Sequence, residues 1–93
     1  MPTAVKTFAA NAFAALLKKS GVEHAGIHAR AHKRPPDPGA LLGGFNVHLR
    51  AELTGAPDSL LDADKLAKGV GTALRAAGFH RCRVFVAIEV TVR

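Results

Sequence analysis

The sequence contains no tryptophan and no tyrosine, and it has only one cysteine and one methionine among 93 residues. Much of its 48% hydrophobic share is alanine, and 5 phenylalanines are the only large aromatic anchors. A core built from such residues is thin, because a domain of this size buries only about 60–65% of its unfolded surface. We therefore expect one domain, residues 1–93, that gains stability by assembling with further copies of itself.

The single cysteine, Cys82, excludes an internal disulfide and is typical of proteins from reducing compartments. The alanine-rich stretch 8–17 is too short to span a bilayer, and no signal-peptide cleavage pattern follows it. We therefore expect a cytoplasmic protein without a membrane span. The glycine pairs lack the following lysine and serine of a phosphate-binding loop, and no other motif predicts a cofactor.

Acidic residues are also few: 7 against 13 Lys and Arg, which gives a net charge of +6. Such a surface attracts carboxylates, phosphates and nucleic acids. No block of like charges predicts a nucleic-acid-binding arm, however, and the usual base-stacking side chains Trp and Tyr are missing. A small anionic ligand is therefore a stronger prediction than a nucleic acid.

Hydrophobic periodicity predicts two helices. The first covers residues 8–19, after a lead at 2–7 that we expect to be either a short strand or irregular. The second is expected to begin near Ser59, which forms a capping-box pattern with Asp62, and to run to about Ala77.

Alternation of apolar and polar residues predicts three strands, at 22–33, 45–53 and 81–92. The expected order is (β)αββαβ, an α+β fold in which two helices pack on the apolar face of one small sheet. The other face of the sheet then carries mainly basic and histidine side chains: His24, His28, Arg30, His32, His48, Arg50, Glu52, Arg83 and Glu89.

This polar face is the most informative feature of the sequence, because solvated sheets usually carry Thr, Lys and Glu. It is either a solvent-facing or interface surface, or an anion-binding surface, since Arg and His donate well to carboxylate and phosphate. A zinc site formed by His28, His32 and His48 is a third interpretation. Nothing in the sequence sets the register that would bring the three together, so we predict no metal.

Two further residues have chemistry of their own. Cys82 falls on the apolar side of the last strand, where we expect it to act as a small buried hydrophobe; a nucleophilic pair with His80 is the alternative. Pro2 follows the initiator methionine. If Met1 is removed, Pro2 carries a free secondary amine that can act as a general base near neutral pH.

Three stretches stand out together with Pro2 at the N-terminus: AGIHARAH at 25–32, FNVHLRAELTG at 45–55 and VFVAIEV at 84–90. In these stretches the chain resembles the 5-carboxymethyl-2-hydroxymuconate isomerases of the tautomerase superfamily. The resemblance implies βαβ units assembled as a homotrimer. It also implies an isomerase that moves a proton in a small enol or dienol carboxylic acid.

On this sequence the resemblance implies Pro2 as the catalytic base and Arg30 as the residue that holds the substrate carboxylate. On the same polar face, Arg50, His48 and His28 are the candidate substrate-binding residues. The chain departs from the family in two respects: an arginine after the second strand is missing, and the first strand and helix are shortened.

The leading helix, the two strands, the glycine-terminated helix and the valine-rich last strand are also similar to the alkaline-shock protein family. Its members have no catalytic residues and act through assembly at the cell envelope. Small phage neck and tail proteins share the αββαβ outline and form rings. The alternative prediction is therefore a non-enzymatic, oligomeric assembly protein, for which a free Pro2 is unnecessary.

Overall fold

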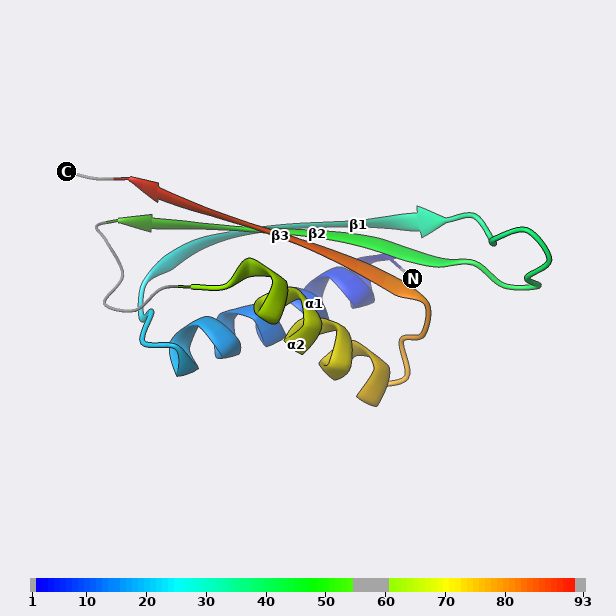
Figure 1. Ribbon diagram of the computed structural model, residues 1–93, viewed down its shortest axis with the longest axis horizontal. Helices are drawn as coiled ribbons and strands as arrows, with labels where there is room; N and C mark the ends of the chain where they lie inside the picture. The colour runs from blue at the N-terminus through cyan, green and yellow to red at the C-terminus, as the bar shows by residue number, and fades with distance from the viewer. Residues whose placement is uncertain (1, 55–60, 92–93) are drawn as a thin grey trace.

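A computed structural model describes residues 2–54 and 61–91 (Figure 1). The elements are helix α1 (Pro2–Lys19), strands β1 (Ala25–Arg34) and β2 (Gly44–Thr54), helix α2 (Ala63–Ala76) and strand β3 (Cys82–Thr91). The strands form one sheet in the order β1-β2-β3, in which β2 runs antiparallel to β1 and parallel to β3. Both helices lie on one face of this sheet (Figure 1). The predicted α+β class, the order αββαβ and the placement of the helices are confirmed.

The prediction for residues 2–7 is wrong, because they form the first turns of α1 and not a strand or an irregular lead. The buried residues of α1 recur every four positions, so its apolar stripe begins before residue 8: Val5, Ala9, Phe13 and Leu17. Pro2 is the first helical residue, a position that suits proline because its missing N–H and fixed φ cost nothing there.

Helix α2 begins later than predicted, because Asp62 is its N-cap. Oδ1 of Asp62 accepts hydrogen bonds from the backbone N–H groups of Asp64 at 3.0 Å and Lys65 at 3.2 Å. These bonds satisfy two of the donors that the first turn of a helix leaves unpaired. Ser59, the predicted start, lies outside the described residues. The helix ends where the sequence suggested, before Gly78, whose φ of 93° favours glycine.

The core lies between the two helices and the face of the sheet that they cover. The central strand β2 supplies as many buried side chains as α1 does, whereas β1 and β3 supply only partly buried ones. The buried set is Val5, Ala9, Phe13, Leu17, Val47, Leu49, Ala51, Leu53, Leu66, Val70 and Leu74. Among the described residues, no polar or charged side chain is buried. No described helix combines the length and the apolar character needed to cross a membrane.

The hairpin that joins β1 to β2 extends beyond the helices and makes the molecule elongated, 49 × 21 × 20 Å (Figure 1). Arg34 ties the hairpin to the start of β3. Its guanidinium donates to the carboxylate of Asp37 and to the backbone carbonyl of Arg81, each at 3.1 Å. Gly44 lies so close to the backbone of Arg81 that a Cβ would collide with it. These contacts hold the first residues of the parallel strands β2 and β3 next to each other.

Two glycines of α2 provide a matched test of helix packing. A Cβ at Gly69 would lie 2.8 Å from Cδ1 of Leu16 in α1, whereas at Gly71 the nearest atom is Nη1 of Arg75 at 3.8 Å. We expect Gly71→Ala to raise the free energy of unfolding by about 0.5–1 kcal/mol, because alanine has the higher helix propensity. Gly69→Ala should gain less or destabilise, because Leu16 must move. Urea unfolding measures both, and equal gains would contradict the close contact between the helices.

Candidate functional site

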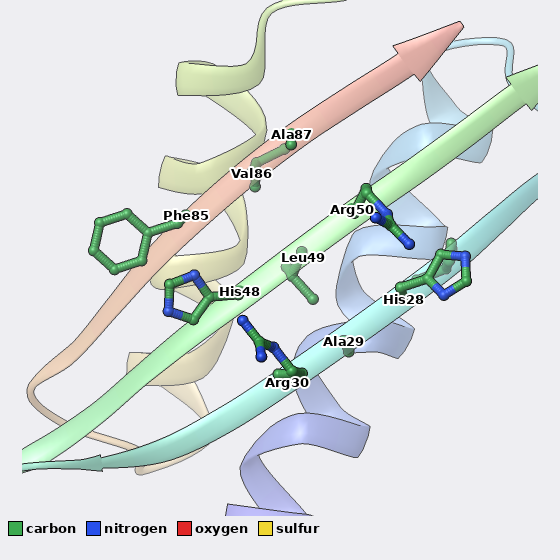
Figure 2. A pocket seen from close by; sticks show the side chains of 10 residues that line it. His28, Ala29, Arg30, His48, Leu49, Arg50, Phe85, Val86 and Ala87 are labelled. Atoms are coloured by element: carbon green, nitrogen blue, oxygen red, sulfur yellow. The ribbon is translucent and has the colours of Figure 1, made fainter. Parts of the chain in front are cut away.

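The face of the sheet that the helices leave uncovered, called the open face below, carries a shallow depression of about 700 Å³. Figure 2 shows the lining side chains, which come from all three strands. The depression centres on one row of paired residues: Ala29, Leu49 and Val86. Because side chains alternate across a strand, the residues on either side of this row project from the open face.

Strand register brings four of the five predicted site residues together. Arg30 of β1 pairs with His48 of β2. On the other side of the Ala29–Leu49 pair, His28 pairs with Arg50. All four line the depression (Figure 2). The sequence placed them on one face; the antiparallel pairing of β1 and β2 makes them neighbours.

Pro2 does not join this group. It lies in α1, which packs on the covered side of the sheet, whereas Arg30 projects from the open face (Figure 1, Figure 2). Within one chain, the sheet therefore separates the predicted catalytic base from the predicted carboxylate holder.

Two glutamates neutralise part of the open face. Oε1 of Glu52 lies 3.3 Å from both Nε2 of His28 and Nη2 of Arg50, and Nη1 of Arg50 lies 3.8 Å from Oε1 of Glu89. These side chains are about half exposed, so each pair contributes at most about 1 kcal/mol. Arg50 is thus already engaged by carboxylates. No carboxylate of the described residues lies within ion-pair distance of Arg30, which makes Arg30 the better placed of the two to bind an external anion.

Three aromatic rings cross the open face from strand to strand. The ring centroids of His32 and His48 are 5.4 Å apart, those of His48 and Phe85 are 4.9 Å apart, and both pairs are within 15° of parallel. Figure 2 shows His48 and Phe85 beside each other, and both line the depression. Phe85 is 48% exposed although it is large and apolar. Phe85 is not among the residues predicted for the site, although its alternation with Arg83 and Ala87 along β3 is a sequence signal for the open face.

The zinc interpretation receives no geometric support. Within residues 2–54 and 61–91, no three His, Cys, Asp or Glu side chains gather closely enough to hold a metal ion. His28 lies four residues from His32 along β1, and the imidazole of His28 contacts the carboxylate of Glu52 instead.

Cys82 is half-buried on the covered side of β3. Its Sγ lies 3.9 Å from the backbone carbonyl oxygens of Phe79 and His80. Burial raises the pKa of the Cys82 thiol, against smaller lowering effects of a backbone hydrogen bond from Phe45 and of the charge on Arg34. This environment favours the protonated thiol and is unlike that of a catalytic thiolate.

No protein-family model matches this chain, and no curated protein matches it. The resemblances to the tautomerase and alkaline-shock families therefore stay predictions.

The raised pKa of Cys82 predicts a slowly reacting thiol, because only the thiolate attacks and its fraction falls when the pKa rises. We expect a chromogenic disulfide reagent to modify the folded protein several-fold more slowly than free cysteine at pH 8. Its rate should also begin to rise only at higher pH. The urea-unfolded chain is the control and should react like free cysteine. Fast modification of the folded protein at neutral pH would instead support the Cys82–His80 pair.

Proposed function

We propose that this protein is a non-catalytic assembly protein that forms homo-oligomers through the open face of its sheet. The observation that carries the proposal is the one-sided sheet. Both helices cover the same face, and none of the described residues covers the other (Figure 1). A sheet face that carries a half-exposed phenylalanine and paired charges of both signs is suited to contact another protein surface.

The thin core supports the same proposal. Its fully buried side chains include only one phenylalanine, Phe13, and β1 and β3 contribute none that are fully buried. Association adds buried area without lengthening the chain, which is how small domains commonly gain stability. Large apolar side chains also remain exposed on β3, at Phe85 and Val90, and on the hairpin, at Leu41 and Leu42.

The position of Pro2 supports a function without catalysis. Its place at the start of α1 has a structural explanation in the helix-starting preference of proline. Arg30 lies on the other side of the sheet, so a single chain does not combine a proline base with a carboxylate holder.

We expect the sedimentation coefficient of the untagged protein to rise with concentration between about 5 and 500 µM, because assembly by mass action populates larger species. The protein should first be treated with nuclease, since residual nucleic acid on a chain of net charge +6 would imitate association. A single monomeric species over the whole range would contradict the proposal.

A proton-moving isomerase is the second candidate function. One observation favours it: Arg30, Arg50 and His48 line the same depression, and such donors suit a carboxylate. Because Pro2 and Arg30 lie on opposite sides of the sheet, this function would require Pro2 from a neighbouring copy, with Met1 removed.

An assay with a small dienol carboxylic acid separates the two candidates. We expect the wild-type protein not to accelerate ketonisation above the buffer rate. Acceleration that falls by about 10²–10⁴-fold in Pro2→Ala, as expected for loss of a general base, would replace the first candidate with the second. Arg30→Ala should then raise KM, whereas Arg75→Ala, on the exposed side of α2, is the matched control and should have no effect.

A further inference from the structure

We infer that the open face binds the open face of a second copy of this chain, about a two-fold axis that crosses the strands at Ala29, Leu49 and Val86. This inference rests on the proposed function and adds the partner and its contacts. The axis reverses the strand direction of the second copy. Each end of one open face therefore lies over the opposite end of the other.

The two ends of the open face carry opposite charges, with Arg50 and Arg30 between them, which makes this arrangement self-complementary at its ends. At one end, Glu52 and Glu89 are paired in register across β2 and β3. At the other end, Arg83 pairs with Asn46, which pairs with His32. Reversal of the second copy places the acidic end of each chain over the basic end of the other. Stacking without reversal would place glutamate over glutamate, which is unfavourable.

The midpoint of this pattern on β3 is Val86. Arg83 and Glu89 lie equally far from it on either side, and so do Phe85 and Ala87. A two-fold axis at Val86 therefore places Glu89 over Arg83 of the second copy. It also places Phe85 over Ala87 of the second copy. A large side chain over a small one suits two sheets packed about 10 Å apart.

The depression lies at the same midpoint. It is centred on the row of Ala29, Leu49 and Val86, and Phe85 and Ala87 are among the residues that line it (Figure 2). The phenyl ring of each copy can therefore enter the depression of the other. This contact removes from water the most exposed large apolar side chain of the sheet, Phe85.

The area of the open face predicts a weak dimer. Ten-residue strands such as β1 and β3 rise about 33 Å, and three strands span about 14 Å. Two such faces together bury roughly 900 Å², near the lower limit for a specific complex. We expect a dissociation constant of about 1–100 µM.

Charge reversal on β3 tests the pairing by analytical ultracentrifugation at low salt. In Arg83→Glu alone, and in Glu89→Arg alone, like charges meet at both ends of the dimer. We expect either change to raise Kd about tenfold or more. The double variant Arg83→Glu/Glu89→Arg carries both changes in one chain, so opposite charges again meet between the two copies, and Kd should return to near the wild-type value. A mixture of the two single variants should form a heterodimer tighter than either homodimer.

Arg75→Glu is the matched control, because it changes the net charge as Arg83→Glu does but lies in α2 on the covered side of the sheet. It should leave Kd unchanged. Phe85→Ala and Ala87→Phe test the central contact without changing charge, and both should raise Kd. Thermal unfolding followed by circular dichroism checks that each variant is folded.

The outcomes distinguish this inference from the proposed function. A wild-type protein that stays monomeric overturns both. An oligomer that Phe85→Ala weakens, but whose Kd the double charge reversal does not restore, leaves assembly through the open face in place and overturns the two-fold pairing. An oligomer whose Kd ignores the charge reversals and the change at Phe85 assembles through another surface and overturns both. A monomer that binds a short single-stranded DNA with strongly salt-dependent affinity would assign the open face to nucleic acid and would also overturn the inference.

Discussion

The packing of both helices against one side of the central strand β2 is the interaction on which the rest of this structure depends. Four side chains of β2 are buried there, against the apolar stripes of α1 and α2. The described residues of this 93-residue chain form one helical layer and one sheet. Because side chains alternate along a strand, burial of one side of β2 forces His48, Arg50 and Glu52 onto the other. The open face is thus a direct consequence of how the core is built.

The chemistry of the open face depends on which of its charges are already paired. Glu52 and Glu89 face each other on neighbouring strands, where their carboxylates repel. The guanidinium of Arg50 contacts both carboxylates and offsets this repulsion. Arg30 has no such partner among the described residues. The donors that suit a small carboxylic acid suit a protein carboxylate equally well. The same face therefore accommodates either an anionic substrate or a complementary protein surface, and the position of Pro2 favours the second.

The family resemblance rests on short alternating segments such as AGIHARAH and VFVAIEV. Any half-buried strand has this alternation, because one side faces a core and the other does not. Short alternating segments are therefore similar in many unrelated proteins, and their similarity does not require common descent. A catalytic constellation is more demanding, because it requires particular side chains on the same side of the sheet. Pro2 does not meet this requirement, because it lies on the covered side of the sheet and Arg30 on the open face.

Much of the fold could be predicted from periodicity alone. The two-residue period located all three strands, and the apolar stripe located both helices, because these patterns report burial of neighbouring residues. The ends of elements were less predictable, since they depend on competition between local groups. Asp62 and not Ser59 caps α2, and Val5 extends the apolar stripe of α1 through residues that alternation alone would allow as a strand.

The sequence by itself therefore determined the elements and the composition of each face, including the positions of Arg30, Arg50, His48 and His28. Only the tertiary structure decided which of these side chains are neighbours and that the parallel pairing of β2 with β3 brings Phe85 beside His48. It alone placed Pro2 across the sheet from Arg30. These features depend on contacts between residues far apart in the chain, whose free energies no local pattern of residues reveals.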